Sequence, residues 1–465
     1  MRKVISKLAW VTGVCLSLLG FNLLRAEASP KSPIYSAVAL PNSLNPSAPL
    51  LFHGLLYFVA ETPLGVRKVH VYDGITVRVA FETRSHHDQD DDPGELTLLG
   101  ESLAFSALQL DRVRKLYVFN GLSLTTRPVN PAGVDDLTHG LVALNGALYF
   151  AALARSHSLK LFRFDGTAVS QVADTRGDPT LSDDPEVPLL FQGQIYFSSH
   201  VANGASKLFR YDGSRAVQVA DLRQDPELDD DPAGFFVHEN FMLFSAKIAD
   251  HAYKLFSWDG IKVRRLSNTR ADLGLNDDPW DFTEFQGQVL FTSMVGDSSL
   301  GRKRVYKFFQ TDGLKVTSLP IALSSPASFN NDPTDLLVRG LTVYFSSLNP
   351  YEPGSIQLFN GNQVVRVPME RNYVSLNTIK PKILGFIDGN LAFFASDSSG
   401  NTRLFLYSSG RTTRGLNLFP EDSDFGSTTP TWAVYNGLII IKGLVGPGLD
   451  GEIYYTIKPS SGAGQ

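Results

Sequence analysis

A repeat with a period of 47 residues runs through the middle of the chain. Stretches that begin at Lys160, Lys207 and Lys254 read KLFRFDG, KLFRYDG and KLFSWDG, and they superimpose without a gap through the strands and loops that follow. Weaker copies flank them, and a tight-turn dipeptide ending in glycine recurs through the copies, at Asp73, Asn120, Asp165, Asp212, Asp259, Asp312, Asn360 and Ser409. A unit of this length cannot bury its apolar surface alone, so the copies must stack on one another.

Each unit reads as four short strands. In the second of the three copies the segment from Pro188 gives two strands around a Gln-Gly turn, KLFRYDG gives a third that ends at an Asp-Gly turn, and AVQVAD gives a fourth. Leu208 and Phe209 are adjacent and therefore point to opposite faces, and both are apolar. A sheet packed on both faces is what a propeller blade requires. The sequence predicts an all-β fold, a single β-propeller of four-stranded blades.

The two ends of the chain predict how the ring closes. Residues 431–457 supply three strands of a last unit, and residues 34–40 supply a fourth-strand pattern with no preceding three. Counting them together as a shared ninth blade gives nine blades, with the N-terminal strand pairing with the C-terminal blade. Eight blades plus an irregular unit is the alternative, and the units near Lys303 and Asn372 are the least regular. Closure would remove exposed sheet edges.

The first 28 residues have the pattern of a secretory signal. Basic residues precede an apolar run from Leu8 to Phe21, and small residues stand at Ala26 and Ala28. We expect cleavage after Ala28, a propeller domain over 29–465, and a periplasmic or secreted location. An uncleaved anchor is the alternative. The one cysteine, Cys15, lies inside this segment, so the mature chain is expected to have no disulfide.

Charge and hydropathy exclude two classes of partner. Without the four basic residues and one acidic residue of the leader, the chain keeps 38 basic and 46 acidic residues, a net charge near −8. Nucleic acid is therefore an unlikely partner. No later segment is long and apolar enough for membrane insertion of the mature chain.

The repeat resembles a known bacterial family. Leu141 to Phe150 (LVALNGALYF) and Leu161 to Thr167 (LFRFDGT) are similar to the strands and turn of ELWxxDGT-repeat proteins of bacterial surfaces and secretions, and Asn130 to Gly133 looks like their crossover. Lys and Phe replace the Glu and Trp of that motif in most copies. The resemblance implies a propeller or adhesion module without a common chemistry.

The connection from each fourth strand to the next unit is acidic. It reads DDDP, LSDDP, DDDP, NDDP and NNDP in five units, with Asp135-Asp136-Leu137 as a variant. We expect these carboxylates to occupy equivalent places before the channel-lining strands: Asp92, Asp136, Asp184, Asp231, Asp278 and Asp332.

Two interpretations of this acidic arc are open. In the first, the Asp before Pro accepts backbone N–H groups and fixes a turn, while the preceding Arg84, Arg176, Arg223 or Arg270 pairs across the crossover. In the second, the arc concentrates negative potential and binds a cationic partner or Ca²⁺. The calcium ligands would then be Asp91, Asp92, Asp183, Asp184, Asp230 and Asp231.

Trp280 follows one crossover, at a position held by Gly94, Glu186 and Ala233 in other units. It is a candidate exposed platform for a ligand. Trp258 occupies a position filled by Phe or Tyr elsewhere, which indicates core packing.

The predicted channel-lining strands are mostly apolar, so no catalytic residue and no cofactor are assigned. Polar exceptions are scattered over different units, at His53, His238, Glu284, Arg339 and Asp388. We therefore expect a binding or scaffold protein for a protein or glycan partner. The alternative is a hydrolase or lyase that acts on an extracellular polymer at the channel mouth. The sequence leaves the oligomeric state open.

Overall fold

The computed structural model describes residues 35–40, 45–47, 49–94, 96–248, 251–295, 305–319, 333–349, 352–368, 381–387, 389–396, 402–408, 410–414, 432–435, 438–444 and 452–459. All regular secondary structure in these ranges is β-strand, in nine four-stranded antiparallel sheets. The prediction of an all-β chain is confirmed. Among the described residues, no helix is long and apolar enough to cross a membrane. Residues 1–28, predicted to be a secretory signal, and Asp332 lie outside the described residues.

The strands of the first four sheets are β2 (Leu50–Phe52), β3 (Leu55–Glu61), β4 (Arg67–Tyr72), β5 (Val77–Phe81); β6 (Thr97–Leu99), β7 (Ser102–Leu108), β8 (Arg114–Phe119), β9 (Leu124–Thr126); β10 (His139–Leu144), β11 (Ala147–Leu153), β12 (Leu159–Phe164), β13 (Val169–Gln171); and β14 (Glu186–Phe191), β15 (Gln194–His200), β16 (Ser206–Tyr211), β17 (Ala216–Gln218). The next two sheets are β18 (Ala233–Val237), β19 (Met242–Lys247), β20 (Tyr253–Trp258), β21 (Val263–Arg265); and β22 (Trp280–Phe285), β23 (Gln288–Val295), β24 (Val305–Thr311), β25 (Val316–Ser318). The last three are β26 (Thr334–Arg339), β27 (Thr342–Asn349), β28 (Glu352–Phe359), β29 (Val364–Arg366); β30 (Lys382–Ile387), β31 (Asn390–Ser396), β32 (Thr402–Ser408), β33 (Arg411–Arg414); and β34 (Trp432–Tyr435), β35 (Leu438–Leu444), β36 (Glu452–Pro459) with β1 (Tyr35–Ala39).

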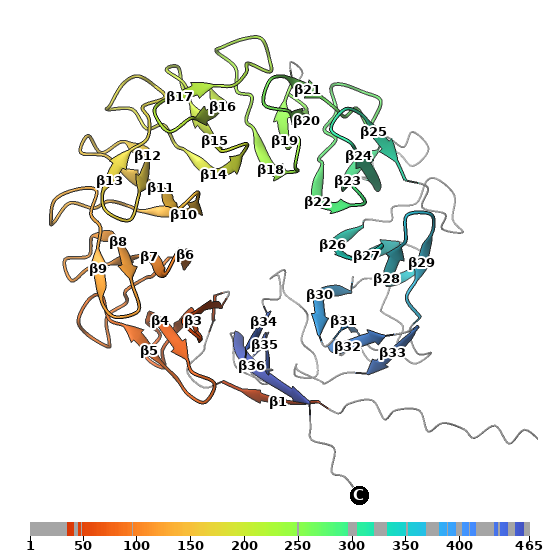
Figure 1. Ribbon diagram of the computed structural model, residues 1–465, viewed down its shortest axis with the longest axis horizontal. Coiled ribbons are helices and arrows are strands. Elements are labelled where there is room, and N and C mark those ends of the chain that lie inside the picture. The colour runs from red at the N-terminus through yellow and green to blue at the C-terminus, as the bar shows by residue number, and fades with distance from the viewer. Residues whose placement is uncertain are drawn as a thin grey trace, which may run out of the picture.

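The sheets are arranged around a common centre, as the blades of a β-propeller are (Figure 1). In eight of the sheets the strands pair in chain order, the first lying nearest the centre and the fourth at the rim (Figure 1). Between sheets the chain returns from the rim to the centre. The described connections that follow β5, β9, β13, β17 and β21, the crossovers, leave their fourth strands at the same end, and we call the side of the ring that carries them the crossover face.

Local turn chemistry explains why the strands end where they do. Gln192 and Gly193, between β14 and β15, have φ angles of 48° and 76°, the pair of positive values that a two-residue hairpin needs. At the β16–β17 turn, Asp212 Oδ1 accepts the backbone N–H groups of Ser214 and Arg215 at 2.9 and 3.0 Å. These bonds, with that of the Ser214 hydroxyl, lower the pKa of Asp212 to about 2. The predicted Asp-Gly turn is therefore a carboxylate-braced hairpin.

The core lies between sheets. Leu208 packs in a cluster with Phe244 and Phe256 of the following sheet, whereas Phe209 packs in a cluster with Tyr149 of the preceding one. The indole N–H of Trp258 donates to Tyr196 Oη of the preceding sheet at 3.0 Å, and both side chains are buried. Both predictions, packing on two faces and a core role for Trp258, are confirmed.

The sheet of β34, β35 and β36 takes its outer strand from the start of the described chain. β1 pairs antiparallel with β36, from Tyr35 opposite Pro459 to Ala39 opposite Tyr455. Strands more than 400 residues apart in sequence therefore share one sheet.

Candidate functional site on the crossover face

The crossovers hold five deeply buried ion pairs. We call the acidic members the buried aspartates, and each is 2% exposed or less. Each accepts from a lysine near the start of the third strand of the preceding sheet, at 2.8–3.2 Å: Lys68–Asp91, Lys115–Asp136, Lys160–Asp183, Lys207–Asp230 and Lys254–Asp277. The five lysines are also 2% exposed or less. A charge is buried this completely only when it is paired and hydrogen-bonded.

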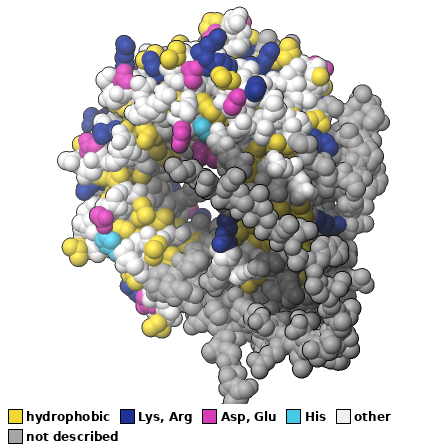
Figure 2. Space-filling view, turned by 45° about the vertical axis from the view of Figure 1, so that its right-hand side comes forward, with side chains coloured by type: hydrophobic (Ala, Val, Ile, Leu, Met, Phe, Trp, Pro, Cys, Tyr) yellow, Lys and Arg dark blue, Asp and Glu magenta, His cyan; other side chains and the backbone are white. Residues whose placement is uncertain are grey.

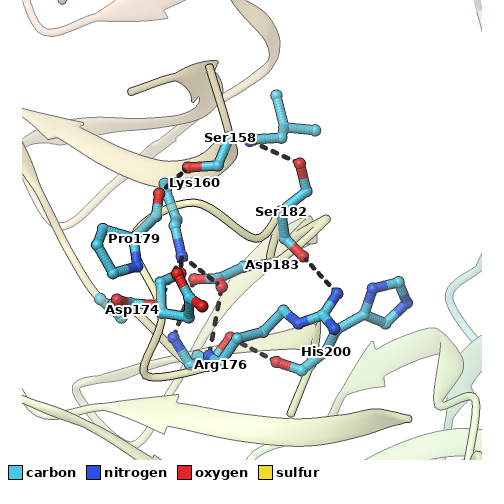
Figure 3. Close-up of polar contacts among 12 residues, drawn as sticks. Ser158, Lys160, Asp174, Arg176, Pro179, Ser182, Asp183 and His200 are labelled. Atoms are coloured by element: carbon cyan, nitrogen blue, oxygen red, sulfur yellow. Dashed lines mark hydrogen bonds and ion pairs between the residues drawn. The ribbon is translucent and has the colours of Figure 1, made fainter. Parts of the chain in front are cut away.

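One of these pairs shows how the crossover is tied (Figure 3). The Lys160 ammonium donates to Asp183 at 2.8 Å and to Asp174 at 2.6 Å. The other oxygen of Asp183 accepts the backbone N–H of Thr175 at 2.9 Å, and its carbonyl accepts the N–H of His200 in the next sheet at 2.8 Å. The aspartate thus joins the third strand of one sheet, its own crossover and the second strand of the next.

An aspartate does accept backbone N–H groups and fix the crossover turn, as the first interpretation predicts, but it lies one residue earlier in the chain than predicted. The aspartate that accepts backbone N–H groups precedes the one next to Pro: Asp230 Oδ2 accepts from Leu222 at 2.9 Å. Burial raises the pKa of Asp230, against the opposing effects of the Leu222 N–H and the Lys207 ammonium.

Three of the four predicted arginines donate to main-chain carbonyl oxygens of their own crossovers. Arg84, Arg176 and Arg223 donate from Nη1 to Asp90 O, Ser182 O and Asp229 O, at 3.1–3.3 Å, within their own crossovers. Arg176 also donates from Nη2 to Ala202 O of the next sheet at 3.2 Å. Their bonds therefore brace each crossover from within, and Arg176 adds a link to the neighbouring sheet.

In four crossovers, the aspartate that directly follows the buried aspartate lies at the surface. These surface aspartates are Asp92, Asp184, Asp231 and Asp278, with φ between 41° and 48°, a left-handed conformation that Asp tolerates. The side chains of the first three are 45%, 50% and 40% exposed. Their partners differ from sheet to sheet, unlike those of the buried aspartates.

Asp92 pairs with Arg114, Asp184 lies 3.2 Å from His200 Nδ1, and Asp231 binds the Lys247 ammonium at 2.9 Å. Asp231 also accepts from the Tyr253 hydroxyl. Burial alone would raise the pKa of Asp231, but the hydrogen bonds from Tyr253 and Lys247 outweigh it and hold that pKa below its ordinary value.

The expected equivalence of Asp136 with Asp92 is wrong. Asp136 is fully buried and bound to Lys115 at 2.9 Å, so it belongs with the buried aspartates. The residue at the surface position of that crossover is Leu137, with φ of 46° and 47% exposure. The second crossover therefore presents no surface carboxylate where the crossovers of Asp92, Asp184, Asp231 and Asp278 do.

The groups bound to the predicted calcium ligands bear on whether those aspartates can hold a cation. Asp91, Asp183 and Asp230 each hold a lysine ammonium, so a cation there would have to displace a buried positive charge. In the described ranges, no three His, Cys, Asp or Glu side chains are grouped closely enough to hold a metal ion. Figure 2 shows Lys and Arg interspersed with Asp and Glu over the described surface in view, rather than a field of one sign.

Trp280 begins β22 and is 37% exposed on the crossover face, as the sequence predicts. Its ring stands edge-on to Tyr306 of β24, with ring centroids 6.2 Å apart. A bulge follows at once, because the β22–β23 register shifts between Trp280 and Thr283 and Asp281 has φ of 56°. The bulge turns the next side chain, Asp281, toward the neighbouring sheet.

Asp281 begins a chain of ionisable groups across three sheets, which we call the inner-strand cluster: Asp281 of β22, Asp335 of β26 and Lys382 of β30. The backbone N–H of Leu336 donates to Asp281 Oδ2 at 3.4 Å. Asp335 accepts from Lys382 at 2.7 Å and from the Ser346 hydroxyl at 3.1 Å. Burial, with the nearby Asp335 charge adding to it, raises the pKa of Asp281.

Sequence reasoning missed the lysines and the inner-strand cluster. A signal for the lysines was present, since four of them stand 23 residues before their aspartate, and Lys115 stands 21 before Asp136. Asp281, Asp335 and Lys382 lie just before the apolar runs that mark the inner strands. No pattern within one unit indicates that they meet. Of the scattered polar residues, Glu284 and Arg339 lie at the opposite, hairpin end of their strands, and Asp388 lies outside the described residues.

No protein-family model matches the chain, and no curated protein matches it. Among solved structures, a Mycobacterium tuberculosis puromycin-hydrolyzing peptidase is 12% identical with a TM-score of 0.37, over 78% of this chain and 60% of that one. The β-propeller domain of the Trilobed protease from Pyrococcus furiosus is 11% identical with a TM-score of 0.36, over 82% of this chain and 100% of that one. TolB from Acinetobacter baumannii is 15% identical with a TM-score of 0.30, over 57% and 63%.

Proposed function

We propose that the chain is an exported, nine-bladed β-propeller, closed by β1 on β36, that binds a glycan or protein at the inner strands of its crossover face. The observation that carries the binding role is Trp280, a large aromatic ring that is 37% exposed. An amphipathic ring that stays partly solvated beside fixed polar groups is a common contact for ligands.

The inner-strand cluster suits recognition. Asp335 is held by Lys382 and Ser346, and Asp281 by backbone N–H groups, so the carboxylates are fixed in place before any ligand arrives. Fixed hydrogen-bonding groups lower the cost of ordering on binding. The ELWxxDGT-like repeat and the leader at residues 1–28 agree with a role outside the cytoplasm.

Binding of soluble extracellular polysaccharides to the mature chain tests the proposal. Trp280→Ala is expected to weaken binding about tenfold, the loss of roughly 1.4 kcal/mol of contact. The matched control is Ile261→Ala, because Ile261 is 89% exposed on the β20–β21 turn, away from the crossover face. Equal affinity of the Trp280 variant and the control would contradict a binding role for this surface.

One observation favours a second candidate, a hydrolase or lyase acting on an extracellular polymer. Asp281, whose pKa is raised, lies beside a second carboxylate, Asp335, that is paired with Lys382. Two carboxyl groups in different environments can divide acid and base roles. Release of new chain ends from a polymer, abolished by both Asp281→Asn and Asp335→Asn, would support catalysis. Binding without any turnover would leave the first proposal in place.

A further inference from the structure

A cavity of about 310 Å³ opens on the crossover face between the starts of β6 and β10. Its wall includes Gly94, Ser106, Arg114, Thr138, His139 and Leu141. The volume falls at the lower end of the roughly 300–1,000 Å³ typical of small-molecule sites. It lies in the crossover that lacks a surface carboxylate.

Two departures from the repeat are found in the cavity wall. Gly94 stands where other units have Glu186, Ala233 and Trp280, and a Cβ there would come within 2.6 Å of Ser106 Oγ. Thr138 stands where the other crossovers have proline, such as Pro185 and Pro232. The first change removes a side chain from the wall and the second adds a hydroxyl to it.

The hydroxyl of Thr138 is buried without a hydrogen-bond partner among the described residues. The residue as a whole is 0% exposed. A buried hydroxyl left in this state costs free energy, and the proline of the other crossovers carries no such group. This hydroxyl, which can both donate and accept, belongs to a residue of the cavity wall but is not reached by solvent, so a ligand would contact it after the Thr138 side chain rotates.

The remaining polar groups of the wall offer hydrogen-bond donors and an acceptor, and the one cationic side chain among them, Arg114, is ion-paired. Arg114 pairs with the Asp92 carboxylate and donates from Nη1 to Asp92 O and Ser106 Oγ at 2.8 and 3.2 Å. These bonds use three of its five N–H hydrogens. His139 Nδ1 lies 2.7 Å from Leu137 O, and because a carbonyl only accepts, Nε2 of the neutral ring is left as an acceptor.

We propose that this cavity binds a neutral, hydroxyl-rich ligand of the size of one sugar ring. Hydroxyl groups both donate and accept, which matches Thr138, Arg114 and His139 together, and Leu137 and Leu141 can contact the C–H face of a ring. The Arg114 of the cavity wall is already paired with the Asp92 carboxylate, which also lies 3.8 Å from Arg67, so the wall holds no unpaired cation for an acid. The inference rests on the proposed glycan-binding function and adds a site separate from Trp280, three sheets away along the chain.

Calorimetric titration of the mature chain with D-glucose, D-galactose, D-mannose and N-acetyl-D-glucosamine tests the proposal. At least one sugar is expected to bind. Thr138→Val, which keeps the shape and removes the hydroxyl, should weaken it about tenfold. Thr125→Val in β9 of the same blade, whose hydroxyl donates to Val118 O, is the matched control and should leave the affinity unchanged. Gly94→Ala, which crowds Ser106, is a second variant that should also weaken binding, and melting curves establish that each variant is folded.

Other outcomes overturn the proposal. Failure of all four sugars to bind, or binding of D-glucuronate and D-galacturonate alone, would contradict a neutral ligand. Monosaccharide binding that is lost in Trp280→Ala and kept in Thr138→Val would contradict binding in this cavity but agree with the proposed function. The converse pattern, with polysaccharide binding independent of Trp280, would contradict the Trp280 surface and keep the cavity.

Discussion

The two aspartates of each crossover are neighbours in sequence and opposites in structure. Asp230 is fully buried and paired with a lysine, an arrangement that recurs in five crossovers, whereas Asp231 is 40% exposed and has partners found in no other crossover. The repeated contact indicates that the buried position maintains the ring. The varied contact indicates that the surface position is free to differ between blades, as a recognition surface requires.

The largest expected effect on stability concerns the buried aspartates and their lysines. Lys207→Met leaves the Asp230 carboxylate buried without its ammonium, and breaking one side of a buried pair costs about 3–5 kcal/mol. The free energy of unfolding in urea measures it. The double variant Lys207→Met/Asp230→Asn should recover part of the loss, because it removes the buried carboxylate together with the ammonium and leaves only the partly exposed Asp221, which also pairs with Lys207, without its partner. A loss below about 1 kcal/mol in the single variant would show that the pair does not hold the crossover.

The next largest effect is expected at Thr138, where the substitution should raise the free energy of unfolding. Removing its partnerless hydroxyl in Thr138→Val should raise the free energy of unfolding by about 1 kcal/mol. The control is Thr292→Val, because Thr292 is equally buried but donates to Pro333 O at 2.9 Å, so its loss should destabilise by about 1 kcal/mol. Two changes of the same sign would mean that the Thr138 hydroxyl is bound within the protein.

Substitution of a surface aspartate should change the free energy of unfolding only slightly. Asp231→Asn should cost about 0.2–1 kcal/mol at neutral pH, since its pair with Lys247 is partly solvated. Because the pKa of Asp231 is lowered in the fold, this stabilisation is present above its ordinary value of 3.8 and is lost as pH falls through the folded pKa. Urea unfolding of the variant and the parent chain from pH 7 to pH 3 should therefore converge. A constant difference would contradict the ion pair.

The contribution of Asp281 to stability should change with pH in the direction opposite to that of Asp231, and by a smaller amount. Its pKa is raised, so its contribution to stability is greatest below 3.8 and declines as pH rises through the folded pKa. Asp281→Asn should be less sensitive to pH than the parent chain between pH 4 and pH 7, measured as thermal midpoints. An unchanged pH profile would show that Asp281 is well solvated.

The sequence predicted the features that depend on residues close together in the chain. The Asp212-Gly213 turn, the opposed Leu208 and Phe209, and the acidic crossovers are local features, readable from turn chemistry and alternation. Lys207 was not recognised as buried, because its partner is brought to it only when the crossover folds back across the sheet. The assignment of Asp136 failed because Leu137 and Thr138 replace the Asp-Pro by which the other crossovers are aligned.

The inner-strand cluster could not be predicted for a related reason. Asp281, Asp335 and Lys382 belong to three units, and their contact depends on the bulges and on the angle between neighbouring sheets. Trp280 was identified because it differs from its equivalents in other copies. In a repeated chain, a residue that breaks the pattern is therefore a better guide to a site than one that follows it.

The buried lysine and aspartate have a consequence for how such a chain can grow. Each pair is supplied within one repeat, and the aspartate's carbonyl then accepts a backbone N–H that any following repeat can offer, as His200 and Lys247 do. Duplicating a unit would copy a complete joint, including its means of attachment to whatever comes next. The number of blades could then change by a single genetic event without a new contact having to evolve.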